Sequence, residues 1–331
     1  MRLTFPMAAL LLVAACGPAP RVRPSLPAPD PSIAEAARAS LAEAPALRRG
    51  AVVVLDATSG QILARVGRGP LGDGEALRVA PVGSTWKTLT VAAALDAGLD
   101  ASRRFEDLEG RWGEGAARVE DWQARPWHDA RSTLVHSSNV GAAMITDAVG
   151  PASLLRLVDN LRLADALELA EGEVPGLALP PAAAWNLPVP DWGRLRPEAR
   201  PWAAGVNIEA SLLHLAVAYA AVANDGRTRW PTADGTGEAL RALRATTART
   251  VRDALRAAVT EGTGAQAAVA GVDVGGKTGT AALDEGRAAL FAGFFPPRRV
   301  ALVRVEGGPE LTGGGTAAPV FAALVRRLAQ R

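Results

Sequence analysis

The two lysines of the chain are the side chains best suited to chemistry, because every other basic residue is an arginine. Of the 36 basic residues, 34 are Arg and only Lys87 and Lys277 are Lys. A buried lysine amine can lose its proton near neutral pH, whereas a guanidinium remains charged. We therefore expect the two lysines where the protein needs a proton acceptor or a compact positive charge.

The first lysine ends the motif Ser84-Thr-Trp-Lys87, which opens a helical segment. Three residues make almost one helical turn, so the Lys87 amine can return to the Ser84 hydroxyl. A serine becomes an effective nucleophile when a neighbouring base takes its proton, and the N-terminus of a helix favours developing negative charge. The alternative interpretation of so short a motif is a capping serine followed by an exposed lysine.

The second motif is Ser137-Ser-Asn139, which lies just before a helical segment that begins at Val140. A second hydroxyl near a lysine can relay a proton to a leaving group, and an amide can hold a substrate carbonyl. Taken alone, the motif is equally typical of a helix cap followed by a turn asparagine. Its meaning therefore depends on the other motifs.

The third motif, Lys277-Thr-Gly-Thr280, lies in a strand-like run. Gly279 leaves room for another backbone to approach the strand, and an extended peptide can add to such an edge. The ammonium of Lys277 and the hydroxyls of Thr278 and Thr280 make a cluster that can bind a carboxylate. The alternative, a turn with a surface lysine, is weakened by the apolar residues around the motif.

The order and spacing of the three motifs are more specific than any one of them. Ser84 and Ser137 are 53 residues apart, and Ser137 and Lys277 are 140 residues apart. Motifs of these kinds occur together in penicillin-binding proteins and serine β-lactamases. From Gly50 to the C-terminus the chain resembles the transpeptidase domain of penicillin-binding proteins, and further similar stretches lie at residues 51–64, 213–224 and 251–264.

This resemblance implies a peptidoglycan D,D-transpeptidase or D,D-carboxypeptidase that acts on stem peptides ending in D-Ala-D-Ala. Ser84 would attack the penultimate D-Ala carbonyl and form an acyl-enzyme, with Lys87 as its base. Ser137 and Lys277 would pass a proton to the leaving amine, and Asn139 would orient the substrate. β-Lactam antibiotics would acylate the same serine as substrate mimics.

The resemblance also assigns the groups that bind substrate. Thr278, Gly279 and Thr280 would contact it, with the two hydroxyls on its terminal carboxylate. The backbone N–H groups of Ser84 and Thr280 would form the oxyanion hole. No cofactor and no metal are implied, and the three histidines of the chain lack the spacing of metal ligands.

Two alternatives to a transpeptidase stay open at this point. One is a serine β-lactamase-like hydrolase, in which Glu173 would activate the deacylating water. The other is a β-lactam or muropeptide receptor, or a scaffold lipoprotein with weak acylation. The sequence departs from the family pattern at Trp86, where a phenylalanine is usual, and at residues 205–211, which only partly retain the usual Gly-Gln-Gly and Thr-Pro.

The elements that must position these residues indicate an α+β fold. Apolar, β-branched runs near both ends of the chain predict strands at residues 51–56, 61–66, 272–280, 288–295 and 299–305. Helices are predicted at residues 85–96, 209–223 and 315–330. We therefore expect an antiparallel five-stranded sheet flanked by helices, built from residues 50–83 and 264–331, with an inserted all-helical lobe of residues 84–263.

The first 49 residues predict export and anchoring. Residues 1–15 carry a positive charge and then an apolar run that suits a signal peptide but is too short to span a bilayer. The run ends in Ala-Ala-Cys16, which resembles a lipobox, so Cys16 is the expected lipid-attachment site. Residues 16–49 are rich in Pro and Ala and are expected to be a linker. The domain of residues 50–331 would then be held on the extracytoplasmic, periplasmic side of a bacterial membrane.

The composition argues against several other classes of protein. A hydrophobic fraction of 49% with 21% charged residues supports a large core rather than a disordered chain. A net charge of +2 with scattered arginines argues against a nucleic-acid partner, and the single cysteine excludes an internal disulfide framework. The partners implied by the resemblance and by the N-terminus are peptidoglycan stem peptides, β-lactams, a membrane reached through the lipid, and a glycosyltransferase of wall synthesis.

Overall fold

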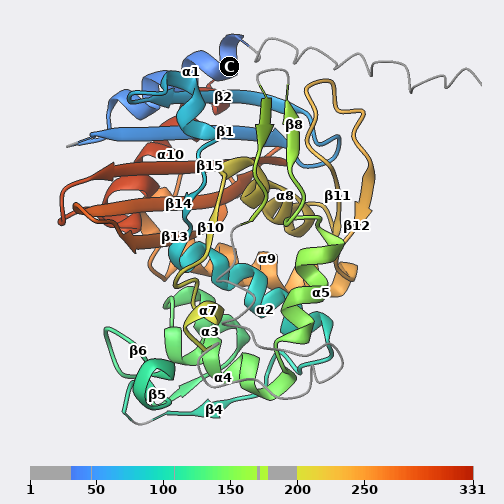
Figure 1. Ribbon diagram of the computed structural model, residues 1–331, viewed down its shortest axis with the longest axis vertical. Coiled ribbons are helices and arrows are strands. Elements are labelled where there is room, and N and C mark those ends of the chain that lie inside the picture. Colours follow the sequence, from blue (N-terminus) through green and yellow to red (C-terminus); the bar gives the residue numbers. More distant parts are fainter. Residues whose placement is uncertain (1–30, 46, 108, 170–171, 178–199, 331) are drawn as a thin grey trace, which may run out of the picture.

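A five-stranded antiparallel sheet joins the two ends of the folded chain (Figure 1). The computed structural model describes residues 31–45, 47–107, 109–169, 172–177 and 200–330. In the order β13–β14–β15–β1–β2, the strands span Gly275–Ala282, Arg287–Phe295, Arg299–Gly307, Arg49–Asp56 and Ile62–Arg68. The predicted α+β fold with a five-stranded antiparallel sheet is therefore confirmed.

Strand β1 is apolar along most of its length because both faces of the sheet are covered. Val53 and Leu55 pack into one hydrophobic core, and Val52 and Val54 pack into a second core on the opposite face. A strand buried on both faces needs no alternation of polar and apolar residues. Val53 lies opposite Leu302 of β15, so a strand from the beginning of the folded chain is held by one from its end.

Helices α1 (Pro31–Ala42) and α10 (Ala318–Ala329) cover one face of the sheet (Figure 1). The Phe321 ring of α10 lies 4.7 Å from the Phe291 ring of β14, measured between centroids. Helix α1 buries Ile33 in the same core. Aromatic and aliphatic side chains from both termini therefore close this side of the molecule.

Helix α1 corrects the predicted extent of the linker. The sequence predicts a linker over residues 16–49, but α1 packs against β2 and α10 and is part of the folded body. Its buried side has only two large apolar side chains, Ile33 and Leu41, beside two alanines and a serine, which gives a weak hydrophobic periodicity. The predicted signal peptide, residues 1–15, and Cys16 lie outside the described residues. Within the described part of the chain, no helix combines the length and the apolar character needed to cross a bilayer.

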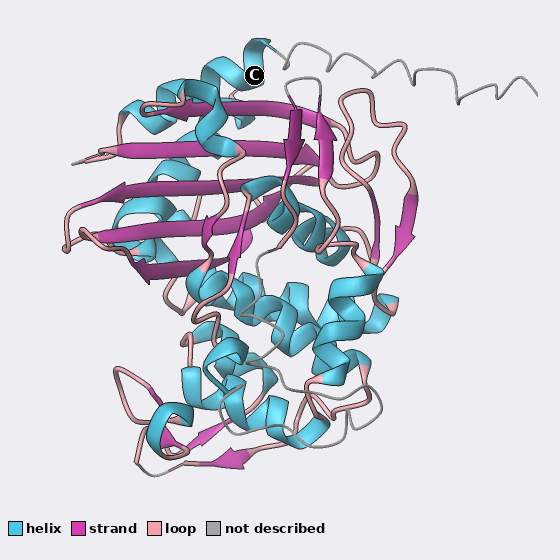
Figure 2. Cartoon of the chain, in the orientation of Figure 1, coloured by secondary structure: helices cyan, strands magenta, loops and turns pink. Residues whose placement is uncertain are grey.

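The other face of the sheet carries the helical lobe (Figure 2). Its central helix, α8 (Leu212–Ala223), is buried at every residue because it packs against β1 and β15 on one side and α9 on another. That burial explains its almost wholly apolar sequence. The other helices among the described residues of the lobe are α2 (Lys87–Asp96), α3 (Ala130–Val135), α4 (Asn139–Val149), α5 (Ala152–Asn160), α7 (Arg200–Ala203) and α9 (Ala245–Thr260).

The lobe is mainly helical, but it also contains short strands that the sequence analysis does not predict. Strands of two or three residues are too short to show a period of two. The pairs are β4 (Phe105–Glu106) with β7 (Trp127–His128), β5 (Arg111–Trp112) with β6 (Val119–Glu120), β8 (Leu167–Leu169) with β9 (Gly172–Val174), and β11 (Arg227–Arg229) with β12 (Ala239–Arg241).

A further short pair connects the two parts of the molecule in front of the sheet. Strand β3 (Ala80–Pro81) pairs with β10 (Glu209–Ala210), at residues that the sequence predicts as the start of a helix. The helix begins later because Ser211 caps α8: its hydroxyl accepts a hydrogen bond from the backbone N–H of His214. Strand β3 leads directly into the turn that holds Ser84.

Candidate active site

The three sequence motifs meet beside the edge strand β13. Ser84 lies in a 3-10 turn, Gly83–Trp86, that leads into α2. Ser137 lies in the turn between α3 and α4, and Lys277 lies on β13. Among the described strands, β13 pairs only with β14, so its other edge faces the lobe. The sheet and the lobe thereby bring together hydroxyls and amines that are far apart in the sequence.

Lys87 is the centre of the site. Its Nζ lies 2.7 Å from Ser84 Oγ, and it donates to the carbonyl oxygen of Ser137 at 2.8 Å. Complete burial lowers the pKa of Lys87 to about 7, although the carboxylate of Asp121 acts in the opposite direction. Near neutral pH a substantial fraction of this amine is therefore unprotonated and able to take the proton of Ser84.

Ser137 connects the two lysines. Its hydroxyl oxygen lies 2.7 Å from Lys277 Nζ and 3.5 Å from Lys87 Nζ. Burial first, and then the nearby Lys87, lower the pKa of Lys277 well below its ordinary value. The backbone of Ser137 has a φ of 59°, a left-handed conformation that is unfavourable for most residues other than glycine. The fold holds this serine in a strained turn that directs its hydroxyl between the amines.

Asp121, which is not among the site residues predicted from the sequence, holds the second motif in place. Its carboxylate accepts hydrogen bonds from the Ser138 hydroxyl at 2.5 Å and from the backbone N–H groups of Asn139 and Val140. These are N-terminal groups of α4, where a carboxylate is favoured. No spacing rule singles out this aspartate, because it lies in an irregular segment 16 residues before Ser137.

Asn139 has one amide hydrogen fixed by the protein. Its Nδ2 donates to the carbonyl oxygen of Glu120 at 2.7 Å. An asparagine amide has two N–H groups and a carbonyl, and the second N–H and the Oδ1 oxygen make no hydrogen bond with the described residues. The bond to Glu120 fixes the plane of the amide beside the Ser137 turn.

The hydroxyls of the third motif are also oriented by neighbours outside the motif. Thr278 Oγ1 lies 2.8 Å from Thr263 Oγ1, and Thr280 Oγ1 accepts a hydrogen bond from the backbone N–H of Gly313 at 3.1 Å. Thr263 and Gly313 are separated from the motif in sequence and carry no signal of their own. Thr278 and Thr280 are two residues apart on β13, so their hydroxyls share one side of the strand, while the Lys277 amine contacts Ser137.

The turn that holds Ser84 packs directly on β13. Gly83 has a φ of +51°, and a Cβ atom at this residue would lie only 2.8 Å from the Thr280 carbonyl oxygen. A Cβ atom at Gly279 would likewise lie 2.9 Å from the Thr85 side chain. Both residues must be glycine because the turn and the strand approach each other too closely for a side chain. The backbone segments of Ser84 and Thr280, the two groups expected to form the oxyanion hole, are therefore neighbours.

Helix α8 supports the nucleophile turn from behind. The Tyr219 hydroxyl lies 2.8 Å from that of Thr88 and donates to the carbonyl oxygen of Thr85 at 2.9 Å. Trp86 is almost completely buried and packs in the core, and a Cβ atom at Gly205 would lie 2.9 Å from its Cβ. The two places where the sequence departs from the family pattern, Trp86 and the segment that begins at Gly205, are thus in contact with each other.

Of the other residues considered from the sequence, Glu173 and His214 lie apart from this network, whereas His128 Nε2 lies 3.9 Å from Asp121 Oδ2. Glu173 is exposed on strand β9. His128 is buried and its Nε2 lies 3.2 Å from Asp107 Oδ2, whereas His214 is bonded to Ser211 and to the Asp165 carbonyl. In the part of the chain that the structure describes, no group of three or more His, Cys, Asp or Glu side chains is arranged to hold a metal ion.

Comparison with known proteins agrees with this geometry. Residues 50–326 match the family model of the penicillin-binding protein transpeptidase domain. The chain is 32% identical over 307 residues to the probable peptidoglycan D,D-transpeptidase PenA of Neisseria flavescens, with 83% of this chain and 73% of that protein covered. It is 33% identical over 313 residues to PenA of Neisseria gonorrhoeae, with 83% of this chain and 50% of that protein covered.

A solved structure supports the same relationship. The TP domain of penicillin-binding protein 3 from Burkholderia pseudomallei superimposes with a TM-score of 0.75 at 29% identity, and the match covers 95% of this chain and 97% of that one. The chain spans about half to three quarters of the length of the curated Neisseria relatives. With a family model that matches 277 of its 331 residues, the chain belongs to the family of penicillin-binding protein transpeptidase domains, as its motifs predict.

Proposed function

We propose that the protein is a peptidoglycan D,D-transpeptidase, or a D,D-carboxypeptidase, that acts through an acyl-Ser84 intermediate. One observation carries the proposal: an unbroken polar chain runs from Ser84 through Lys87 and Ser137 to Lys277. Both amines are fully buried. Buried amines destabilise a folded protein unless they are neutral or well paired, so their retention supports catalysis over a receptor or scaffold role.

In the acylation step, neutral Lys87 takes the proton of Ser84 as Oγ attacks the penultimate D-Ala carbonyl. A bond forms between Oγ and the carbonyl carbon, and the carbonyl oxygen becomes an oxyanion. The N–H groups of Ser84 and Thr280 would donate to that oxyanion, and each such donor lowers a barrier by about 3 kcal/mol in other enzymes. The close packing of Gly83 on Thr280 supports this assignment.

The tetrahedral intermediate then expels the terminal D-Ala. Its amine leaves with a proton delivered through the Ser137 hydroxyl, which is reprotonated from a neighbouring lysine. Lys277 is 2.7 Å from that hydroxyl, and Lys87 has just received the proton of Ser84. The C–N bond breaks, free D-alanine departs, and the acyl group stays on Ser84.

The site would recognise the C-terminal end of the peptide by its carboxylate. Thr278 and Thr280 would donate hydrogen bonds to it, and the bound carboxylate would favour the protonated form of the nearby Lys277 amine. Gly279 between them keeps the strand free of side-chain bulk. The amide of Asn139 would hold the carbonyl of the residue before the acyl group, on the opposite side of the cleft.

Deacylation decides between the two enzyme types. In a transpeptidase, an amine from a second stem peptide attacks the acyl-enzyme and forms a new peptide bond. In a carboxypeptidase, water attacks instead and the product is a shortened peptide. Either attacking group loses a proton to Lys87, which restores Ser84 for the next cycle.

A β-lactamase-like hydrolase is not favoured by the site. Glu173, the candidate for activating water, is exposed on the β8–β9 hairpin, whereas the groups around Ser84 are two amines and a hydroxyl. The carboxylate of Asp121 is engaged by the N-terminus of α4. We therefore expect a stable penicilloyl-enzyme rather than steady hydrolysis of the antibiotic.

The proposal is tested with a synthetic pentapeptide that ends in D-Ala-D-Ala, with and without an acceptor amine. We expect release of D-alanine in both cases and a cross-linked product when the amine is present, measured by mass spectrometry. Release of D-alanine with water as the sole acceptor would identify a carboxypeptidase. Absence of D-alanine release together with absence of penicillin acylation would refute the enzymatic proposal.

Asp121 gives a prediction that separates electrostatics from folding. The substitution Asp121→Asn should slow acylation by roughly tenfold, the equivalent of one charge-assisted hydrogen bond. Because the Asp121 carboxylate raises the pKa of Lys87, its removal should also move the acid limb of the acylation rate to lower pH.

The measurement for Asp121→Asn is the rate of acylation by a fluorescent penicillin between pH 5 and 9. Asp100→Asn is the matched control, since Asp100 is exposed and the hydrogen bonds of its carboxylate among the described residues are to Ser102. A slower rate with an unshifted acid limb would show that Asp121 acts on the Ser137 turn alone and leaves Lys87 unaffected.

We also propose that residues 1–15 are a lipoprotein signal peptide and that Cys16 carries lipid. The sequence Ala-Ala-Cys16 at the end of an apolar run supports this, as does the need to reach peptidoglycan outside the cytoplasm. A glycosyltransferase of wall synthesis on the same membrane would be the partner that supplies glycan strands. Cys16→Ser should move the protein from the membrane fraction to the soluble fraction, and unchanged fractionation would contradict the lipid anchor.

A further inference from the structure

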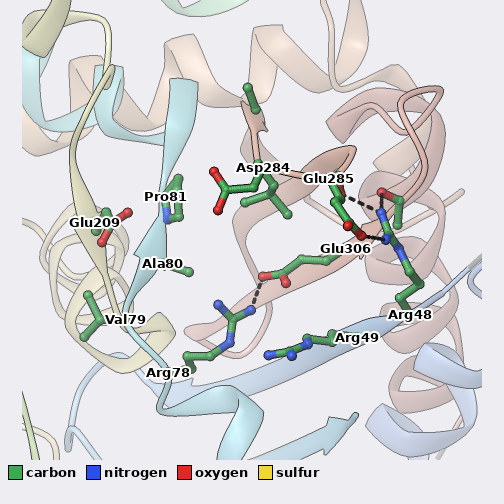
Figure 3. Close-up of a pocket in the computed structure, with 13 residues that line it drawn as sticks. Arg48, Arg49, Arg78, Val79, Ala80, Pro81, Glu209, Asp284, Glu285 and Glu306 are labelled. Atoms are coloured by element: carbon green, nitrogen blue, oxygen red, sulfur yellow. Dashed lines mark hydrogen bonds and ion pairs between the residues drawn. The ribbon is translucent and has the colours of Figure 1, made fainter. Parts of the chain in front are cut away.

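Two clusters of largely buried ionisable side chains adjoin segments that lead to the catalytic groups. One borders the charged pocket at the end of β13 (Figure 3), where the Arg78 guanidinium pairs with Glu306 and its charge is satisfied within the protein. The other consists of Asp107, His128 and Asp121, and it lies behind the second motif. In the second cluster one buried polar atom has no hydrogen-bond partner among the described residues. That cluster therefore needs a functional explanation.

His128 lies between two buried carboxylates. Its Nε2 atom is 3.2 Å from Asp107 Oδ2 and 3.9 Å from Asp121 Oδ2, and each of the three side chains is at most 5% exposed. Carboxylate oxygens accept hydrogen bonds, so Nε2 is the ring nitrogen that carries a hydrogen. This hydrogen lies between two like charges that would otherwise repel each other in the same buried space.

The other ring nitrogen of His128, Nδ1, makes no hydrogen bond with the described residues although it is fully buried. An apolar side chain of similar size would avoid the cost of burying an unpaired polar atom. Packing alone therefore does not explain a histidine at this position. The contacts of Nε2 with the two carboxylates are the property that an apolar residue could not supply.

Asp121 connects the His128 ring to the second motif. Its Oδ2 atom, which faces Nε2, also accepts the hydrogen bond of the Ser138 hydroxyl. Its Oδ1 atom accepts hydrogen bonds from the backbone N–H groups of Asn139 and Val140. Each carboxylate oxygen therefore has its own donors, and a rotation of the carboxylate would break both sets of bonds.

Asp107 holds the other side of the ring. Its Oδ1 atom accepts hydrogen bonds from the backbone N–H groups of Glu109 and Gly110, both at 3.0 Å. The carbonyl oxygen of Gly110 in turn accepts a hydrogen bond from the backbone N–H of Asp121 at 2.9 Å. The two carboxylates are therefore also connected through the backbone of one loop, which fixes their distances from the His128 ring.

We propose that His128 is a positioning residue for acylation. Held by Asp107, its Nε2–H group fixes the Asp121 carboxylate in the orientation that holds the turn of Ser137. That turn carries the carbonyl oxygen and the hydroxyl that contact Lys87, so the orientation of Asp121 affects the catalytic base. The inference rests on the proposed acyl-enzyme mechanism and extends it to Asp107 and His128.

The test is a double-mutant cycle between His128 and Asp121 in the full chain, with the rate of acylation by a fluorescent penicillin as the readout. We expect His128→Leu to slow acylation about fivefold, a size typical of the coupling between neighbouring polar residues. Asp121→Ala, which removes both carboxylate oxygens, should slow it about twentyfold. The double variant should be no slower than Asp121→Ala alone, because His128 acts through that carboxylate. Independent effects would multiply to about a hundredfold.

Two further variants separate positioning from stability. His128→Gln keeps an amide N–H group near the place of Nε2 and should be acylated within about twofold of the wild-type rate. His214→Leu is the matched control, because His214 is also buried but bonds to Ser211 and to the Asp165 carbonyl. It should lower the thermal midpoint but keep the acylation rate within about twofold. All rates are measured at a temperature below the thermal midpoint of every variant.

The inference is overturned by a wild-type rate in His128→Leu, by a His128→Gln variant as slow as His128→Leu, or by a double variant slowed about a hundredfold. Equal slowing of His214→Leu would assign the effect to the general loss of a buried histidine, and would overturn the inference as well. In all these cases the wild-type protein is still acylated and the proposed function is unaffected. If the wild-type protein is not acylated at all, the proposed function fails and the inference fails with it.

Discussion

The substitution Ser84→Ala should abolish labelling of the protein by a fluorescent penicillin. Ser84 Oγ is the hydroxyl that lies 2.7 Å from the buried amine of Lys87, and alanine has no atom that can form the ester bond. The measurement is a fluorescent band on a denaturing gel, which reports only covalent attachment. We expect no band above background after incubation that labels the wild-type protein completely.

A second serine variant makes this result specific. Ser102→Ala removes an exposed hydroxyl that bonds only to Asp100, and it should label like the wild-type protein. Labelling of Ser84→Ala at the wild-type rate would mean that another residue is the nucleophile, and the assigned mechanism would then be wrong.

Replacement of Lys87 by methionine should slow acylation by about a thousandfold, the usual contribution of a positioned general base. Methionine fills a similar volume but cannot accept a proton. In the wild-type protein the acylation rate should rise with pH through about 7, the pKa of Lys87, because the neutral amine is the active form. The Lys87→Met variant should lose that rise, which rate measurements from pH 5 to 9 would reveal.

The Lys87→Met substitution should slow acylation but stabilise the folded protein. The loss of rate could then not be explained by misfolding. Lys87 has a pKa of about 7 in the folded protein and an ordinary value of 10.5 when unfolded. Between these values the unfolded chain binds more protons, so the free energy of unfolding rises with pH, and below pH 7 the buried charge is most destabilising. Lys87→Met should therefore raise the thermal midpoint at pH 6. A lower thermal midpoint at pH 6, or an acylation rate that decreases by less than tenfold, would contradict the role of Lys87 as a buried general base.

The motif residues could be predicted because their chemistry depends on type and local spacing. Ser84 and Lys87 need only one turn of helix to meet, and the scarcity of lysine draws attention to both amines. Strands such as β1 and β14 are long apolar runs, so their existence and their place at the two ends of the chain also follow from the sequence. The convergence of the motifs on one cleft is a property of the fold, and the family resemblance is what made it predictable.

The remaining features depend on contacts that no local pattern records. Asp121 acts through the N-terminus of a helix that begins 18 residues later, and Thr263 acts through one hydroxyl across the cleft. Strands β3 and β10 are two residues long. Such short strands show no pattern in the sequence and are identified only by their pairing in the structure. Helix α1 lies within the Pro- and Ala-rich stretch that is predicted as a linker, but its own sequence has one proline and five alanines, and Ala36 and Ala37 pack in the core against the sheet.

Because α1 packs onto the sheet, the segment that connects the folded domain to Cys16 is short. If Cys16 is embedded in the leaflet through its acyl chains, only 14 residues separate it from Pro31, and such a stretch cannot exceed about 50 Å even when fully drawn out. A tether that ran freely to residue 49 would allow roughly twice that radius. The catalytic cleft would then stay close to the lipid headgroups. There it would reach newly delivered glycan strands before the layers of cell wall that lie farther from the membrane.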